Sequence, residues 1–406
     1  MTKKRIIIAI IIVVIAVAAG AAYMFYYQPE DNRSRIDLPI AEPVGEVEPV
    51  LEVVAEDLGL IWGIDFIPDT TLLLATQNNG SLYLIDTDSL DVSQIIGVPA
   101  VDSSGQGGLL DVTVSPDFAE DATVYLTYST NNQAGDKTTH LASGILSIDE
   151  LTLSDVNVLY VAEPFLSSNS HFGSRVIVDG EHLYMSIGDR GDKNFDNHVS
   201  QDTSNVLGTT IRLNRDGSIP ADNPFVGNPD VLDEIYTYGH RNVQGMAIEP
   251  ATGAIWQSEH GERDGDEINR LEAGGNHGWP IATYGCGYVT GRDIGSFPED
   301  RDDTINPVYY WECGSGGFPP AGMTFYDADG FVDWQGDLFV GGLASEYLAH
   351  FRVTDDGLQE LDPLLAEEGW RVRDVTVGQH DGALYAAVEG RNISIVRIVP
   401  KPIKSD

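Results

Sequence analysis

The chain has 406 residues, with 23 lysine and arginine residues against 63 aspartate and glutamate residues, so its formal net charge is −40. A surface this acidic repels phosphate backbones, which excludes nucleic acid as a partner and argues against anionic lipid. The same charge is typical of proteins that stay soluble in high salt, so it does not by itself indicate an acidic function.

The first segment, residues 1–5, ends in the basic cluster Lys3, Lys4 and Arg5, and an uncharged apolar run follows over residues 6–27. A helix of about this length crosses a bilayer. A cleavable signal peptide is the alternative, but the run is longer than a usual signal core, so we expect an uncleaved transmembrane anchor. Residues 1–5 would then be a cytoplasmic stub and residues 28–49 a linker. The rest of the chain would lie on the periplasmic side of the inner membrane, or be exported.

Residues 50–400 repeat one pattern six times between Trp62 and Gly390: a short apolar run, a turn rich in Asp, Gly or Pro, and a second apolar run. The copies are spaced by roughly 45 to 85 residues, as expected for propeller blades with added loops. The pattern predicts an all-β fold, a six-bladed β-propeller, followed by a short tail over residues 401–406. Two β-sandwiches are the alternative, but they give no reason for a sixfold repeated hairpin.

Polar residues gather at one predicted end of this ring. Because the two strands of a hairpin are antiparallel, residues before the first strand and residues after the second lie at the same end. The residues at this end include Gln106, His171, Asp189, Asn194, Arg241, Asn242, residues 260–267, Arg371 and Arg373. Turns at the other end are plain DG, PD and ATG sequences, so the asymmetry predicts a binding mouth at one rim.

His171 alone fits a turn residue without a role more readily than a catalytic base. The hairpin that follows it returns Asp189 to the same end, where a carboxylate can accept the imidazole N–H and make the other ring nitrogen a base. The pair therefore suggests a base and the residue that orients it.

Arg371 and Arg373 share one side of a strand because side chains alternate. Together with Arg241 and Asn242 they indicate an anionic ligand. The alternative is that the two arginines form local ion pairs with Asp374 and Glu368.

The segment over residues 259–267 is acidic and rich in glycine, which suits a hard cation with oxygen ligands, although a solvated run of charges explains it equally well. The two cysteines, Cys286 and Cys313, can form a disulfide in an exported protein, but their number does not prove a pairing. The sequence contains no nucleophile elbow, P-loop or dinucleotide fingerprint, and redox chemistry would need a cofactor.

Several motifs resemble, in the same order, those of the soluble aldose sugar dehydrogenases of the glucose/sorbosone dehydrogenase family, which use pyrroloquinoline quinone (PQQ). They include GQGGLLDVTVSPDF, HFGSRVIVDG, EIYTYGHRNVQGMAIEP and EHGERDGDEINRLEAGGNHGWP, and the likeness covers about residues 51–399. The resemblance implies a six-bladed propeller that oxidises the C1 hydroxyl of an aldose to the lactone with PQQ and Ca²⁺. It also implies a sugar substrate and a respiratory electron acceptor as partners, and leaves a monomer or a homodimer open.

The resemblance implies a role for each matching residue. His171 would be the general base, Asp189 its hydrogen-bond partner, and Arg241 the group that stabilises charge on the quinone oxygen. The remaining matches would bind ligands: Asn242, Arg371 and Arg373 the cofactor, the carbonyls of Gly261 and Glu262 the calcium ion on it, Gln106 and Asn194 the sugar, and Glu267 with the carbonyl of His277 a second, structural calcium ion.

Two positions depart from the family pattern. Ser170 stands where glucose-oxidising relatives carry Asp before the base, so the preferred sugar stays open. Leu343 and Ala344 stand where relatives place a lysine against PQQ, so we expect weaker cofactor binding. Two other functions stay open on the same fold, a calcium-dependent lactonase or other hydrolase and a propeller that binds protein or glycan without catalysis.

Overall fold

The computed structural model describes residues 47–403. The predicted cytoplasmic stub, membrane anchor and most of the predicted linker lie outside these residues. Within them, no helix combines the length and the apolar character that a membrane crossing requires.

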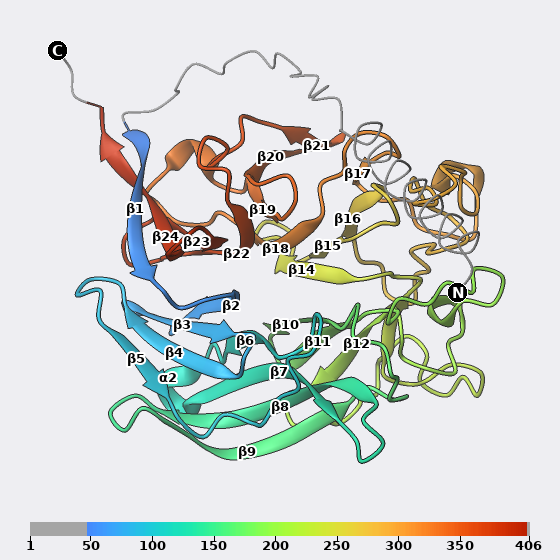
Figure 1. Cartoon of the computed structure of the whole chain (residues 1–406), viewed down its shortest axis with the longest axis horizontal. Coiled ribbons are helices and arrows are strands. Elements are labelled where there is room, and N and C mark those ends of the chain that lie inside the picture. Colours follow the sequence, from blue (N-terminus) through green and yellow to red (C-terminus); the bar gives the residue numbers. More distant parts are fainter. Residues whose placement is uncertain (1–46, 404–406) are drawn as a thin grey trace, which may run out of the picture. The chain divides into compact units, whose positions relative to one another are not determined.

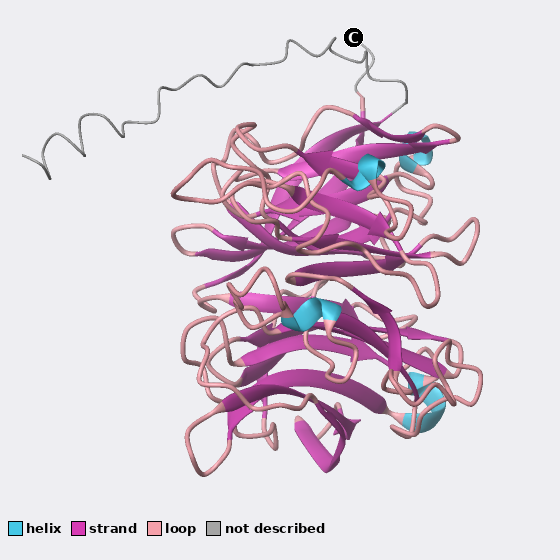
Figure 2. Ribbon diagram, turned by 90° about the vertical axis from the view of Figure 1, so that its right-hand side faces the viewer, coloured by secondary structure: helices cyan, strands magenta, loops and turns pink. Residues whose placement is uncertain are grey.

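The described chain folds into six four-stranded antiparallel sheets arranged around a common centre (Figure 1). The first three sheets are β2 (Ile61–Phe66), β3 (Leu72–Gln77), β4 (Ser81–Asp86) and β5 (Val92–Ile95); β6 (Leu109–Val114), β7 (Thr123–Asn131), β8 (Lys137–Ser147) and β9 (Thr152–Val161); and β10 (Gly173–Asp179), β11 (His182–Ile187), β12 (Thr209–Asn214) and β13 (Ile235–Tyr238). The last three are β14 (Val243–Ile248), β15 (Ile255–Glu259), β16 (Asp266–Arg270) and β17 (Tyr309–Trp311); β18 (Pro320–Phe325), β19 (Leu338–Gly342), β20 (Leu348–Thr354) and β21 (Gly357–Glu360); and β22 (Arg371–Val377), β23 (Leu384–Glu389), β24 (Ile393–Pro402) and β1 (Val47–Glu56). The helices of the described chain are short (Figure 2), and the α-helix α2 (Phe118–Asp121) is labelled in Figure 1. The predicted six-bladed propeller is therefore confirmed.

The first strand of the chain closes the ring. β1 pairs with β24 and completes the sheet of β22, β23 and β24. It begins at Val47, inside the segment predicted as linker, and Val47 pairs with Pro402. Arg371 pairs with Glu389 at the opposite end of this sheet, so the described chain starts and ends at the rim away from the predicted mouth.

Apolar side chains fill the spaces between neighbouring blades. One cluster combines Leu74 and Leu82 of the first blade with Val112 and Leu126 of the second. Period-two alternation places such residues on one face of each strand, and their burial between sheets provides the main stabilisation of the ring.

Buried carboxylates join the inner strands of neighbouring blades. The backbone N–H groups of Ile64, Val114 and Val176 donate to Asp374, Asp65 and Asp111 respectively, each at 2.8 Å. The guanidinium of Arg175 donates to Asp111 at 2.7 Å and to Asp374 at 2.9 Å. These bonds link β22, β2, β6 and β10, so they fix the strands that carry the polar rim.

Because the net charge is −40, repulsion between surface carboxylates destabilises the folded chain at low salt. Raising KCl from about 0.05 M to about 1 M screens this repulsion and is expected to raise the melting temperature by roughly 5–10 °C, measured by circular dichroism. Sucrose at the same osmolality does not screen charge and is the control. A melting temperature that does not change with KCl would contradict this expectation.

Candidate active site

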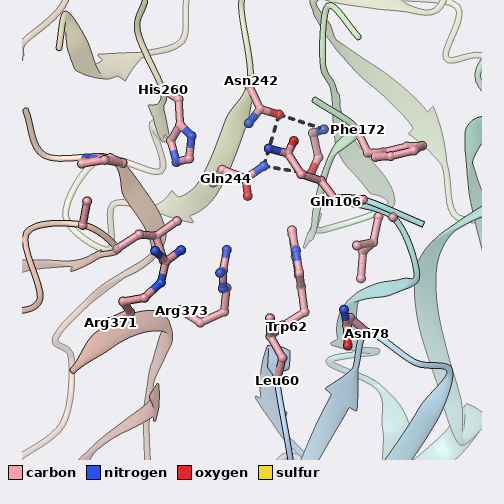
Figure 3. A pocket seen from close by; sticks show the side chains of 17 residues that line it. Leu60, Trp62, Asn78, Gln106, Phe172, Asn242, Gln244, His260, Arg371 and Arg373 are labelled. Atoms are coloured by element: carbon pink, nitrogen blue, oxygen red, sulfur yellow. Dashed lines mark hydrogen bonds between the residues drawn. The ribbon is translucent and has the colours of Figure 1, made fainter. Parts of the chain in front are cut away.

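A cavity of about 290 Å³ lies at the end of the ring where the inner strands begin (Figure 3). All six blades contribute to its lining, which includes Trp62, Asn78, Gln106, Phe172, Asn242, Gln244, His260, Leu343, Ala344, Arg371 and Arg373. The predicted mouth is therefore present at the predicted rim. His171, Asp189 and Arg241 are not among the lining residues, but their chain neighbours Phe172 and Asn242 are.

His171 and Asp189 are in direct contact. Nδ1 of His171 lies 2.6 Å from Oδ1 of Asp189, and the backbone N–H of His171 donates to Oε1 of Gln106 at 2.7 Å. The hairpin of β10 and β11 creates the contact, because it returns Asp189 to the end at which His171 precedes β10. Since Asp189 accepts a hydrogen bond from Nδ1–H, Nε2 of His171 is left as the basic nitrogen.

Asp189 is buried, with only 1% of its surface exposed, and it accepts further hydrogen bonds. Nε1 of Trp279 donates to Oδ2 at 3.0 Å, and Nε2 of His198 lies 3.4 Å from the same oxygen. Burial by itself would raise the pKa of Asp189, but the hydrogen bonds from His171 and His198 and the charge of Arg241 hold that pKa below its ordinary value. The carboxylate therefore stays ionised and can stabilise a protonated His171.

Sequence reasoning missed Trp279 and His198, because both reach Asp189 from long loops outside the repeated hairpins. His198 begins the short helix Val199–Gln201, and Trp279 lies between β16 and β17. The only signal was that Trp279 lies in the quoted motif GGNHGWP.

Arg241 and Arg373 each have a buried Nε–H group without a hydrogen-bond acceptor among the described residues. Nε of the third mouth arginine, Arg371, lies 3.1 Å from Oε2 of Glu389 in an ion pair. Arg241 donates through Nη2 to Glu262 at 2.8 Å. An unpaired buried donor costs about 1–3 kcal/mol, so a ligand that offers acceptor oxygens here would bind favourably.

Arg371 and Arg373 do not form the alternative local ion pairs with Asp374 and Glu368. Both arginines share the carboxylate of Glu389, which lies opposite Arg371 in the register of β22 and β23. Two cations on one carboxylate leave a net positive charge at the cavity, which suits an anion.

The acidic segment after β15 is not a solvated run of charges, because Glu259, Glu262, Asp266 and Glu267 are buried. The carboxylate of Glu262 contacts Arg241 and Lys193. The backbone carbonyls of Gly261 and Glu262 accept no backbone hydrogen bond within residues 47–403, so both remain available as oxygen ligands. No group of three or more His, Cys, Asp or Glu side chains in that range is arranged as a metal site.

The other predicted ligands differ in position. Glu267 and His277 are both buried, and Asn269 lies beside each of them. Nδ2 of Asn269 donates to Oε2 of Glu267 at 3.3 Å, and Oδ1 of Asn269 lies 3.4 Å from Nδ1 of His277. Asn194 is exposed and its backbone N–H donates to Asp192 in its own loop. The structure therefore does not bring Asn194 to the cavity, since the loop positions it without the constraint of a strand.

The two cysteines form a disulfide, with Cα atoms 5.7 Å apart. The bridge holds a loop against the acidic segment: the N–H of Cys313 donates to the carbonyl of Tyr284, and the N–H of Gly314 donates to Asp264 at 2.7 Å. The disulfide thus supports the loop that carries Gly261 and Glu262.

The double variant Cys286→Ser/Cys313→Ser is expected to lower the melting temperature by roughly 5 °C, because losing the cross-link raises the conformational entropy of the unfolded chain. The same change also makes the loop between the two cysteines more mobile in the folded protein. Trypsin should also cleave faster after Arg292 and Arg301, which lie in that loop. Wild-type protein treated with a reductant under native conditions is the control and should behave as the variant does. Unchanged melting and cleavage would show that the bridge does not support the loop.

The chain is similar to known sugar dehydrogenases in sequence and in fold. The model of a family described as Glucose / Sorbosone dehydrogenase matches residues 58–397. The chain is 36% identical over 356 residues to the aldose sugar dehydrogenase YliI of Escherichia coli K12, covering 86% of this chain and 93% of that protein. It is 33% identical over 249 residues to the quinoprotein glucose dehydrogenase B of Acinetobacter calcoaceticus, covering 55% of this chain and 50% of that one. The crystal structure of the E. coli soluble aldose sugar dehydrogenase in the apo-form aligns with a TM-score of 0.81 at 36% identity, over 87% of this chain and 100% of that chain.

Proposed function

Because the chain belongs to the glucose/sorbosone dehydrogenase family, we propose that it oxidises the C1 hydroxyl of an aldose to the lactone, with PQQ as hydride acceptor and Ca²⁺ as its metal. The observation that carries the proposal is a group of three arginines at the rim that carries the His171–Asp189 pair; two of them, Arg241 and Arg373, have a buried Nε–H without an acceptor among the described residues. A base and an anion site at one cavity are what this oxidation needs.

The cavity residues fit PQQ, a flat molecule with several carboxylates. Arg373 would hold a carboxylate oxygen through its Nε–H, which has no acceptor among the described residues, and Arg371 would add its positive charge. Oδ1 of Asn242 accepts hydrogen bonds from Gly173 at 3.2 Å and from Gln244 at 3.3 Å, which orients the amide and leaves its nitrogen as a donor for the ligand (Figure 3). Leu343 and Ala344 supply apolar contact in place of a cation, so the arginines provide most of the attraction.

The fit to calcium rests on backbone oxygens. The carbonyls of Gly261 and Glu262 are free of backbone partners, and hard cations prefer such oxygens. When bound, PQQ accepts the hydride and calcium polarises the quinone carbonyl. We propose that a second calcium ion binds near Glu267 and the carbonyl of His277, in a structural role.

The reaction requires the chain to remove one proton and to stabilise negative charge. Nε2 of His171 takes the proton of the sugar hydroxyl, because Nδ1 is held by Asp189 at 2.6 Å. Asp189 then stabilises the imidazolium by its charge. Arg241 places a positive charge and an unpaired Nε–H beside the site, where charge develops on the acceptor. Gln106, which lines the cavity and holds the backbone of His171, is proposed to contact the sugar.

We further propose that residues 6–27 anchor the enzyme on the periplasmic side of the inner membrane, or direct its export, and that a respiratory carrier takes up the electrons. The apolar run and its basic flank support this location. The chain would act as a monomer or a homodimer.

The other two functions fit the cavity less well. A metal-dependent lactonase needs side-chain carboxylates that converge on a central ion, whereas this cavity offers arginines and a histidine. A propeller that only binds protein or glycan has no need for a base oriented by a buried carboxylate.

The test is reconstitution of the full-length chain, purified in detergent, with PQQ and Ca²⁺. Aldose-dependent reduction of an artificial electron-accepting dye is expected only when both are added, and removal of Ca²⁺ with a chelator before loading should lower the rate at least tenfold. Absence of dye reduction across a broad aldose panel, with no PQQ absorbance retained after gel filtration, would rule the proposal out. Lactone hydrolysis that survives without PQQ but is lost with chelator would favour the hydrolase.

A further inference from the structure

Arg190 follows Asp189 directly and is buried, with 3% of its surface exposed. Its guanidinium forms no ion pair with any residue of the range 47–403. It donates instead to three backbone carbonyls: Nε to Ser170 at 2.9 Å, Nη2 to Ser168 at 2.6 Å and Nη1 to Lys137 at 3.1 Å. The group also lies over the ring of Phe172, 3.7 Å from its centre. Arg190 therefore binds the turn around His171 on both sides of the histidine.

The turn needs such support, because the backbone of His171 is in the left-handed region, with φ of 51°. The left-handed conformation costs a residue with a Cβ atom about 1–2 kcal/mol of conformational free energy, so it persists only where neighbouring groups hold the backbone in place. Gln106 holds the N–H of His171, and Arg190 holds the carbonyl of the residue just before it. Without Arg190, the turn would keep only the first of these two restraints.

Removing the charged guanidinium of Arg190 from water costs free energy, and its packing on Phe172 alone does not account for why it is buried. Removal from water lowers the pKa of Arg190 to about 10, with the nearby charge of Asp189 acting in the opposite direction. A planar guanidinium can serve three carbonyls at fixed angles, which no other side chain can do. The gain must therefore lie in the geometry that it imposes.

We infer that Arg190 is the positioning residue of the base: by joining the turn over residues 168–172 to the residue after Asp189, it keeps Nδ1 of His171 at hydrogen-bond distance from Asp189. Its effect on turnover rests on the proposed function, whereas its effect on the His171–Asp189 contact does not. A base held in place contributes about 10²–10⁴-fold to the rate, so partial loss of alignment should cost part of that factor.

The test compares Arg190→Lys with the matched variant Arg212→Lys. Lysine keeps the charge near His171 and loses the planar fork, so charge and positioning are separated. Arg212 is also buried and lies in the same blade. It donates to Asn223 and Asp222 and lies over the ring of Tyr236, and none of these partners belongs to the His171 turn. Both variants should lose similar thermal stability.

For the reconstituted enzyme, Arg190→Lys is expected to lower kcat roughly 10–100-fold, with KM for the sugar and Kd for PQQ within about threefold of wild type. Arg212→Lys is expected to leave all three within about threefold. The KM-against-kcat split separates positioning from general loosening, because a loosened cavity would also weaken binding.

The second readout needs neither cofactor nor sugar: titration of His171 by NMR in the cofactor-free protein, assigned with the His171→Ala spectrum. The charged and titratable groups that face His171 and Asp189 are His198, Arg241 and His260, and both lysine variants retain them. Arg190→Lys should move the midpoint of the His171 titration down by at least about 0.5 pH units, because the imidazolium loses its aligned carboxylate. Arg212→Lys should not move it.

A wild-type titration midpoint and a wild-type kcat in Arg190→Lys would overturn the inference, and so would equal changes in Arg212→Lys. If wild-type protein oxidises no aldose while the titration still shifts, the proposed function fails and the positioning role stands. Should Arg190→Lys not fold, Arg190→Gln, which keeps one amide donor for the turn, gives the same two readouts.

Discussion

Replacing His171 by alanine is expected to lower kcat of the reconstituted enzyme by roughly 10²–10⁴-fold, while the Kd for PQQ stays within about threefold. Of the two ring nitrogens of His171, Nε2 is the one that can accept a proton, because Nδ1–H donates to the carboxylate of Asp189 at 2.6 Å. Asp189 cannot replace it, because its pKa is held below the ordinary range by its hydrogen-bond donors and it is a weak base. The measurement is steady-state dye reduction at saturating sugar, with PQQ binding followed by calorimetry.

The matched control is His182→Ala. His182 lies in the same blade and pairs with Asp179 at the tip of the same hairpin, so it is at the rim opposite the cavity. Its replacement should leave kcat and PQQ binding within about twofold of wild type. A His171→Ala enzyme with kcat near wild type would show that proton removal is done by another group, and Asp189 would then have no partner to orient.

The ring was predictable because its signals are local. Each inner hairpin contains two alternating apolar runs and a turn of Asp, Gly or Pro, and this unit recurs six times. The closing strand β1 was not predicted, because its partner β24 lies at the other end of the chain and an edge strand with acidic residues resembles a linker. Nothing near Val47 in the sequence encodes that pairing.

Much of the site followed from the same hairpin geometry, which places Gln106, His171, Asn242 and Asp189 at one rim. Glu389 could also have been predicted as the partner of Arg371, since the hairpin register puts them opposite each other. The rest depends on contacts between loops. Arg190 and His198 lie in the loop between β11 and β12, and Trp279 lies in the loop between β16 and β17. No periodicity constrains where such long loops place the side chains that contact Asp189 and the His171 turn.

Trp279, His198 and Arg190 share a physical role: they hold the predicted pair, His171 and Asp189, in place. Asp189 is ionised and fixed because Trp279 and His198 donate to it, and the turn of His171 is fixed because Arg190 holds its carbonyls. A hairpin repeat can bring two side chains to one rim, but contacts from outside the repeat are needed to hold them within hydrogen-bond distance. The arginines at the mouth are only partly satisfied: Arg371 and Arg373 share one carboxylate, and the Nε–H groups of Arg241 and Arg373 have no acceptor among the described residues, which is why these side chains indicate a ligand.

Replacing Arg373 by alanine is expected to weaken PQQ binding by roughly 10²-fold, because removing one partner of a desolvated charge pair costs about 2–5 kcal/mol. In the cofactor-free protein the same change should leave the melting temperature equal or slightly higher. The variant removes a buried cation whose Nε–H has no acceptor, and burial already lowers the pKa of Arg373, so the ligand-free site gains from its loss. Saturating PQQ should restore most of kcat.

The control is Arg352→Ala. Arg352 also shares a carboxylate, that of Asp337, and is half exposed on β20, away from the cavity lining. It should leave PQQ binding within about twofold. Calorimetry gives the Kd, and the rise in melting temperature on adding PQQ gives an independent measure, because a ligand stabilises only the state that binds it. If Arg373→Ala lowers the melting temperature of the ligand-free protein and leaves the Kd unchanged, Arg373 serves the fold through Glu389, and the anion site must be assigned to Arg241 and Arg371 alone.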